Sequence, residues 1–213
     1  MTRNRKSMIG ALLALMLCAA GTMSAGEHSV QTTADVYPWW DDENPVGTAT
    51  LTRDSSGITA VVHTSGLPAG SAVTLWFIIY NHPEACGSDP CSVPVDMFVP
   101  DVEGDFHFGG GHVVGETGEA TFAGHLSVGD ITGSGRIEIG MGPAVALLDP
   151  FAAEVVLALH VHGPKQTGQT LKAQISSYLG GCETFLGPDG FASGPGDVPN
   201  EVGECSTVQI SRP

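Results

Sequence analysis

Short runs rich in Val, Ile, Thr and Phe alternate with clusters of Gly, Pro, Asp and Ser along most of the chain. Alternation with a period of two places successive side chains on opposite faces of a strand, and helical periodicity is almost absent. The pattern predicts an all-β protein, an antiparallel β-sandwich with little helix. We expect residues 47–213 to form one such domain, preceded by an N-terminal extension at residues 26–46.

Individual strands follow from the same alternation. Residues 48–53 and 58–64 flank the turn sequence Asp54-Ser55-Ser56-Gly57 and should form a hairpin. Residues 73–81 are apolar on both faces, which is typical of a strand at the centre of a sheet. Further strands are expected at residues 105–114, 119–128, 154–162, 171–178 and 205–211, the first two as a second hairpin. One or two helical turns are expected within residues 144–153, where Pro150 interrupts them.

The first 25 residues have the organisation of a secretory signal peptide. Three basic residues precede an apolar run at residues 8–20, and small residues end the segment at Ser24-Ala25. The apolar run is shorter than a membrane-spanning helix requires. The mature protein should therefore begin near Gly26 and be secreted or periplasmic. Lipid attachment at Cys18 is the alternative, but Leu17 stands where a small residue is expected.

Charge narrows the range of partners. The whole chain has a net charge of −15, and removal of the signal peptide leaves five basic residues against 23 acidic ones, which gives −18. Nucleic acids and anionic lipids favour positively charged surfaces. We therefore expect neither as a partner, whereas cations would be tolerated, and the excess of acids also keeps an exported protein in solution.

Four cysteines remain in the mature chain, Cys86, Cys91, Cys182 and Cys205. An even number in an oxidising compartment indicates disulfides, and four cysteines permit three pairings. We favour Cys86 with Cys91 and Cys182 with Cys205, because each pair brackets a loop rich in turn-forming residues. A zinc site is the competing use of four cysteines, but neither spacing matches a zinc ribbon or finger.

Histidines are the residues that most suggest chemistry. His160 and His162 lie two apart on an expected strand and project from the same face, so both rings can approach one copper or zinc ion. A further ligand would come from His112 or His125, with His107 as another candidate. The competing interpretation is that these histidines are polar residues on the solvent face of a sheet, or are hydrogen-bonded at strand ends.

Other candidate motifs are weaker. The chain has no Gly-x-Ser-x-Gly nucleophile elbow and no phosphate-binding loop. Two groups of acids, residues 41–44 and the trio Asp101, Glu103 and Asp105, do not follow a known calcium-loop spacing, so we expect solvated loop carboxylates. Of the adjacent Trp39 and Trp40, one is expected to be packed and one exposed; an exposed Trp can stack on a sugar or a partner, but we favour the interpretation that it covers the edge of the sandwich.

Two resemblances accompany these motifs. Residues 76–86 (Trp-Phe-Ile-Ile-Tyr-Asn-His-Pro-Glu-Ala-Cys), 111–115, 162–164 and 180–182 resemble an uncharacterised family of exported bacterial proteins. The segment His160-Val161-His162-Gly163-Pro164 is similar to the His-Ile-His strand of chordin-type (CHRD) domains, which are β-sandwiches related in fold to copper/zinc superoxide dismutase. The second resemblance implies a dismutase-like sandwich and a metal-facing strand, and it extends no further than the His-x-His motif.

Three hypotheses of function follow. The leading one is a secreted, non-enzymatic β-sandwich that acts as a binding or structural module outside the cytoplasm, toward an extracellular protein or polysaccharide. The alternative is a copper- or zinc-binding protein that uses the His-x-His strand. A hydrolase or carbohydrate binder that uses Trp39 or Trp40 is the third.

Overall fold

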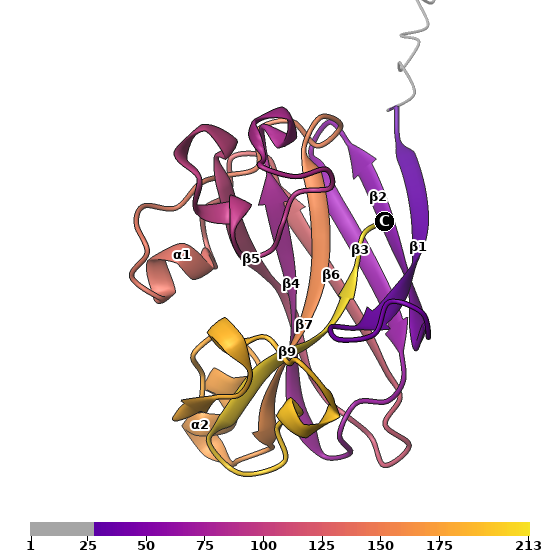
Figure 1. Cartoon of the computed structure of the whole chain (residues 1–213), viewed down its shortest axis with the longest axis vertical. Coiled ribbons are helices and arrows are strands. Elements are labelled where there is room, and N and C mark those ends of the chain that lie inside the picture. The colour runs from indigo at the N-terminus through magenta and orange to yellow at the C-terminus, as the bar shows by residue number, and fades with distance from the viewer. Residues whose placement is uncertain (1–27) are drawn as a thin grey trace, which may run out of the picture.

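The structure is a computed structural model that describes residues 28–213 (Figure 1). The expected signal peptide and Cys18 lie outside the described residues. Within the described part, no helix combines the length and the apolar character needed to cross a membrane.

One large sheet contains all the long strands. In chain order the strands are β1 (Val30–Pro38), β2 (Gly47–Asp54), β3 (Gly57–Thr64), β4 (Ser71–Tyr80), β5 (Gly104–Val113), β6 (Ala120–Ser127), β7 (Glu154–Pro164), β8 (Thr184–Phe185) and β9 (Glu204–Ser211). Their order in space is β5-β4-β7-β9-β1-β2-β3-β6, with antiparallel neighbours, and the short β8 lies parallel to β9. The predicted all-β antiparallel fold with little helix is therefore confirmed.

The sheet curls until its two edge strands meet. Gly109 of β5 and Gly124 of β6 face each other so closely that a Cβ on Gly124 would lie 2.5 Å from the Gly109 carbonyl oxygen. Glycine is required at this contact because any side chain would separate the edges. The result is a flattened barrel in which the β5-β4-β7-β9 half packs against the β1-β2-β3-β6 half (Figure 1).

The space between the two halves holds the larger hydrophobic core. Alternate residues of β4 and β7 point into it, among them Leu75, Phe77, Leu157 and Leu159, each at most 2% exposed. The inward positions of β7 are Val155, Leu157, Leu159 and Val161, as its alternation predicts. This burial of apolar surface is the main contribution that holds the two halves together.

A second core covers the outer face of the β5-β4-β7 half, the face that carries Trp76, Ile78, Ala158 and Phe106. Loops at residues 83–103, helix α1 (Gly135–Glu138), helix α2 (Gly168–Gln174) and residues 178–191 lie over this face. Short 3-10 turns occur within these loops, η1 (Pro83–Ala85), η2 (Asp96–Phe98), η3 (Pro100–Val102), η4 (Pro188–Gly190) and η5 (Pro195–Asp197). Every residue of β4 is buried, so the prediction of a central strand that is apolar on both faces is confirmed.

Two predictions about chain pairing were wrong. Strands β5 and β6 do not form a hairpin: β5 pairs with β4, β6 pairs with β3, and the two occupy opposite ends of the sheet order. Residues 26–46, expected to be an extension, supply β1, which pairs with both β2 and β9. The local turn signal at residues 115–118 is typical of a hairpin, but the pairing partners of β5 and β6 are strands distant in sequence.

Two predictions about local structure were also wrong. Residues 171–178, expected to be a strand, instead complete α2 and the turn that follows it. Leu171, Lys172, Ala173 and Gln174 are good helix formers, and the buried Gln174 side chain is fixed by hydrogen bonds to the carbonyls of His162 and Pro164. Residues 144–153 contain turns rather than helix, and the nearby helical turn is α1.

Both expected disulfides are present. Cys86 is bonded to Cys91 and Cys182 to Cys205. The short bridge closes the loop before η2, and the long one joins the segment after α2 to β9.

Replacing Cys182 and Cys205 together by Ala is expected to lower the free energy of unfolding by about 3 kcal/mol, because the open chain regains the entropy of a long loop. The matched Cys86→Ala/Cys91→Ala variant should lose about 2 kcal/mol, since its bridge spans a sequence separation of 5 rather than 23. Urea denaturation of the two variants measures the difference. A smaller loss for the long bridge would contradict this expectation.

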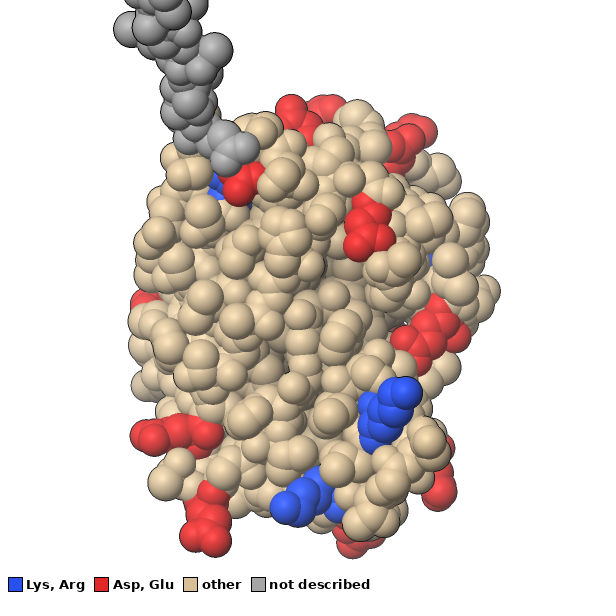
Figure 2. All heavy atoms as spheres, turned by 180° about the vertical axis from the view of Figure 1, so that it is seen from behind, with Lys and Arg blue, Asp and Glu red and all other residues tan. Residues whose placement is uncertain are grey.

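On the face seen in Figure 2, the charged side chains do not gather into one patch. Asp and Glu side chains lie around the periphery of that face and its centre is free of charge (Figure 2). On the outer side of β3 and β6, the cross-strand pairs Thr59–His125 and His63–Thr121 join hydroxyls to imidazoles. The net negative charge keeps copies of the chain apart in solution.

Candidate functional site

A pocket of about 720 Å³ opens on the outer face of the β5-β4-β7 half. We call it the aromatic pocket. The residues that line it are Trp76, Ile78, Pro94, Val95, Met97, Phe98, Phe106, Ile139, Met141, Ala158, Tyr178, Leu179, Phe185, Gly187, Asp189, Gly190 and Phe191. Its volume lies within the range of sites that bind small molecules, and Asp189 is the one charged side chain among these described residues.

The floor of the pocket is a rigid group of rings. Trp76, Phe106 and Tyr178 contact one another pairwise, with ring centroids 5.0–5.4 Å apart. Two of these contacts are edge to face, an arrangement that the ring quadrupoles favour. The Trp76 indole N–H donates to the Thr74 hydroxyl at 2.8 Å, which satisfies its polar atom without using the pocket.

The rim, in contrast, is apolar and exposed. Four large hydrophobic side chains around the opening are accessible to solvent: Val95 (67%), Met141 (51%), Leu179 (39%) and Phe185 (38%). Exposed apolar residues scattered singly are ordinary, but several around one concavity mark a binding surface.

Glu138 joins two walls of the pocket, the segment of α1 and the segment that follows α2. Its carboxylate accepts hydrogen bonds from the backbone N–H groups of Tyr178 and Leu179, both at 2.8 Å. Because Glu138 belongs to α1 and the two donor residues follow α2, this contact holds the opposite walls of the pocket together. The pocket is thus preformed.

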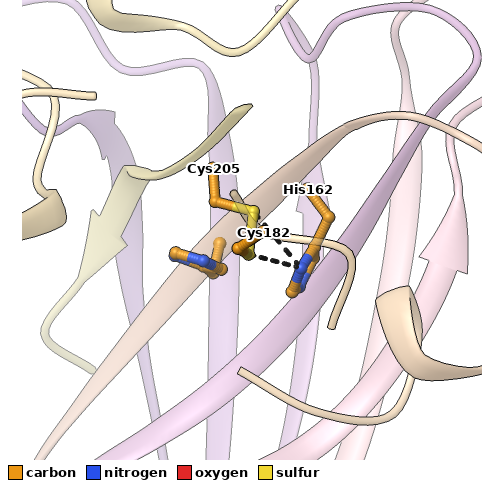
Figure 3. A group of neighbouring side chains, drawn as sticks. His162, Cys182 and Cys205 are labelled. Carbon is orange, nitrogen blue, oxygen red and sulfur yellow. Dashed lines mark hydrogen bonds between the residues drawn. A yellow bond between two sulfur atoms is a disulfide. The ribbon is translucent and has the colours of Figure 1, made fainter. Parts of the chain in front are cut away.

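Beneath Tyr178 lies a second feature, which we call the His–Cys cluster: His160, His162, Cys182 and Cys205. One donor atom from each residue lies within 4.8 Å of the other three. The ring of His162 points at the disulfide, with Nδ1 3.6 Å from the Cys182 sulfur and 3.8 Å from the Cys205 sulfur (Figure 3). His160 and His162 are fully buried, so the interpretation that they lie on a solvent face is wrong.

Each histidine of the cluster is held by neighbouring strands. His162 Nδ1 donates to the Gly180 carbonyl at 2.9 Å, and Nε2 contacts the Thr74 hydroxyl at 2.9 Å. His160 Nδ1 contacts the Thr207 hydroxyl at 3.0 Å, whereas its Nε2 has no hydrogen-bond partner within residues 28–213. The His160 ring also stacks on Tyr178, with centroids 4.2 Å apart, which connects the cluster to the floor of the pocket.

Burial keeps both imidazoles neutral. It lowers the pKa of His162 to about 4, against the smaller opposing effect of the Gly180 carbonyl. The pKa of His160 falls well below its ordinary value because of burial and the neighbouring His162. Burial also raises the pKa of Tyr178 to about 12. The site therefore contains no charged imidazole or phenolate at neutral pH.

The structure does not bring the other candidate histidines to this cluster. His112 pairs with Val73 across β4 and β5, so it is on the opposite face from His160, and its ring contacts Phe122. His125 lies on the outer side of β6 and bonds Thr59. His107 is buried and contacts the Val145 carbonyl at 2.8 Å. Of the four predicted metal ligands, only His160 and His162 converge.

With the disulfide closed, the cluster fits a metal ion poorly. Copper and zinc sites require three or four protein ligands, and disulfide sulfurs are not the thiolates that these ions bind. The oxidised cluster thus offers two imidazoles, His160 and His162, and no further ligand from His112 or His125.

The tryptophans and Asp105 have structural roles, whereas Asp101 and Glu103 are exposed, as expected for solvated loop acids. Trp39 packs on Phe191 with centroids 4.4 Å apart, and Trp40 packs against the inner core; both are half-buried, so neither is fully exposed as one of the pair was expected to be. Asp105, expected to be a solvated carboxylate, is completely buried and accepts four hydrogen bonds.

The fold and the pocket together define a class: an all-β, disulfide-bonded protein with an aromatic cavity on the outside of its barrel. Comparison of the chain with family models, with curated proteins and with solved structures gave no match. Function must therefore be argued from the pocket and the cluster themselves.

Proposed function

We propose that the protein is a non-enzymatic binding module of an oxidising compartment outside the cytoplasm, and that its aromatic pocket takes a small apolar molecule. The observation that carries the proposal is the 720 Å³ cavity with its floor of packed aromatic rings and its exposed apolar rim. The two disulfides support an oxidising compartment. No pair of nucleophile and base lines the pocket among the described residues, which favours binding over catalysis.

The lining restricts the chemistry of the ligand. Rings on the floor favour a flat, ring-bearing molecule that can stack or meet them edge on. Asp189 and the net charge of −15 disfavour an anion. The expected ligand is therefore neutral or cationic, apolar and of ordinary small-molecule size.

A neutral fluorescent dye, N-phenyl-1-naphthylamine, tests the proposal. Its emission should rise saturably on titration with the protein, because the ring system leaves water for the pocket. The sulfonated dye 1-anilinonaphthalene-8-sulfonate should bind more weakly, since its charge is repelled. Absence of saturable binding of the neutral dye would contradict the proposal.

Removing two rim side chains should weaken that binding. We expect the Leu179→Ala/Phe185→Ala variant to bind the dye about tenfold more weakly, because each truncation removes apolar contact area and 1.4 kcal/mol corresponds to a factor of ten. The matched control is Ile131→Ala/Val202→Ala, which truncates two exposed apolar residues away from the pocket. An equal loss in the control would show that the dye binds elsewhere.

A further inference from the structure

The His–Cys cluster contains the donor set of a structural zinc site. Two imidazoles and two thiolates, arranged tetrahedrally, are a common ligand set for zinc in proteins. Here the four side chains come from β7, the segment after α2, and β9, and they are already gathered. We propose that reduction of the Cys182–Cys205 disulfide converts this cluster into a binding site for one zinc ion.

The distances require little movement. In a tetrahedral site with Zn–S near 2.3 Å and Zn–N near 2.0 Å, neighbouring ligand atoms are about 3.3 to 3.8 Å apart. His162 Nδ1 is already 3.6 and 3.8 Å from the two sulfurs. All other separations in the cluster are at most 4.8 Å. Two changes are needed: the sulfurs separate after their bond breaks, and His162 Nδ1 gives up its hydrogen bond to the Gly180 carbonyl, with the ring proton then on Nε2.

The hydroxyl groups of Thr74 and Thr207 are placed to accept hydrogen bonds from the ring nitrogens that would not bind the metal. A ligating imidazole donates its other ring N–H to a neighbouring acceptor, which fixes the ring. For His162, Thr74 lies 2.9 Å from Nε2 and can accept that N–H when Nδ1 is the ligand. The Thr74 hydroxyl can then donate to the His160 carbonyl, 3.4 Å away. Thr207 occupies the corresponding place beside His160.

An unpartnered polar atom points independently to a missing ligand. His160 is fully buried, and its Nε2 has no hydrogen-bond partner within the described residues 28–213. A buried polar atom without a partner destabilises the fold. A cation in the cluster would give the His160 ring the interaction that the protein itself does not supply.

A dithiol can supply the two electrons that reduce the Cys182–Cys205 disulfide. One thiolate of the dithiol attacks a cluster sulfur, the Cys182–Cys205 bond breaks, and the second thiol resolves the mixed disulfide. The dithiol leaves oxidised as its own disulfide, and the two cysteines gain two electrons and two protons. Zinc then displaces both thiol protons as it binds. Cys182 is partly exposed, which gives the reductant access, whereas Cys205 is buried.

The site is distinct from the proposed ligand pocket, although the two share Tyr178, which stacks on His160 and lines the cavity. The inference does not depend on what the pocket binds. It requires only that the disulfide can open while the surrounding strands remain paired.

Zinc binding to the full protein tests the inference. The Cys86→Ala/Cys91→Ala variant removes the other disulfide and leaves the cluster intact. It is treated with a phosphine reductant without oxygen, separated from it, and titrated with zinc chloride; bound metal is counted by mass spectrometry after dialysis. Cobalt(II) serves as a parallel probe, because tetrahedral thiolate ligation gives intense visible bands. Far-UV circular dichroism follows the sheet.

We expect one zinc per chain after reduction, none above background in the oxidised form, and thiolate-to-cobalt absorption. Adding His160→Ala and His162→Ala should weaken zinc binding by about tenfold or more, whereas His63→Ala and His112→Ala should leave it unchanged. Reduced protein that takes up no zinc, or takes it up equally without both cluster histidines, overturns the proposal. If reduction alone melts the sheet, zinc must restore the circular dichroism signal, and failure to do so overturns it as well.

Discussion

Asp105→Ala is expected to lower the free energy of unfolding by about 3 to 5 kcal/mol, because it leaves four hydrogen-bond donors without their acceptor and each buried unsatisfied group costs about 1 to 3 kcal/mol. Its Oδ1 accepts from the backbone N–H of Phe106 at 2.7 Å and of Arg136 at 3.3 Å. Its Oδ2 accepts from the Ser134 hydroxyl at 2.7 Å and from the Val145 N–H at 2.8 Å. One carboxylate thus fixes both the segment that begins α1 and the chain near residue 145.

Urea denaturation at pH 7 measures this loss, and Asp101→Ala is the matched control. Asp101 is an exposed acid four residues earlier in the same segment, so its replacement should change stability by no more than about 0.5 kcal/mol. Equal urea midpoints for the Asp105→Ala variant and the unmodified protein would show that the four hydrogen bonds do not stabilise the fold. Because α1 carries Glu138, we also expect Asp105→Ala to weaken dye binding in the pocket.

The oxidised, metal-free protein is expected to lose stability as the pH falls from about 6.5 to about 4. The folded state holds His162 with a pKa of about 4, whereas the unfolded chain has the ordinary value of 6.5. In that interval the unfolded state binds the extra proton, so stability rises with pH and is lost on acidification. His162 alone accounts for about 3 kcal/mol at 1.36 kcal/mol per pKa unit, and His160 adds to the loss in the same direction.

Three hydrogen-bonded carboxylates titrate below this interval. Hydrogen bonds lower the pKa values of Asp54, Asp96 and Asp197, so their contributions disappear only below about pH 4. Unfolding free energies at several pH values between 4 and 7 give the slope. A His162→Gln variant, whose amide does not titrate, should show a flatter profile than the exposed control His63→Gln. Identical slopes for the two variants would refute the assignment.

The strands and the disulfides could be predicted from the sequence because their signals are local. The turn at residues 54–57 and the alternation on either side of it define β2 and β3. Strand β4 is apolar on both of its faces, which predicts that both faces are buried. Both disulfides close loops that are rich in glycine and proline. Each of these features depends on neighbours within about 20 residues of the chain.

The pairing partners of the strands and the burial of individual side chains could not be predicted from local sequence. Strands β5 and β6 are adjacent in sequence, yet each adds to a different edge of the sheet. His160 and His162 looked like solvent-facing residues because nothing on β7 itself shows that α2 and the segment through Tyr178 lie over them. Asp105 was likewise expected to be a solvated acid, but the chain near Val145, 40 residues away, packs against it and donates a hydrogen bond to its carboxyl group.

The aromatic pocket was missed for a related reason. Its lining comes from six separate stretches between Trp76 and Phe191, and no stretch alone has a recognisable motif. One signal was present: Trp76 and Ile78 lie on the face of β4 opposite the inner core, and a fully apolar outer face requires a cover. The sequence thus indicated that this face is buried, but not that the cover leaves a cavity.

The central claim is that small apolar molecules bind in the aromatic pocket, on the outer face of β4, β5 and β7. Nuclear Overhauser effects between bound N-phenyl-1-naphthylamine and the isotopically labelled protein test it most directly. We predict contacts from the dye to the ring protons of Trp76, Phe106 and Tyr178 and to the side chain of Leu179, in a complex of one dye per chain. Contacts confined to residues outside the pocket, such as Ile131 or Val202, would contradict the claim.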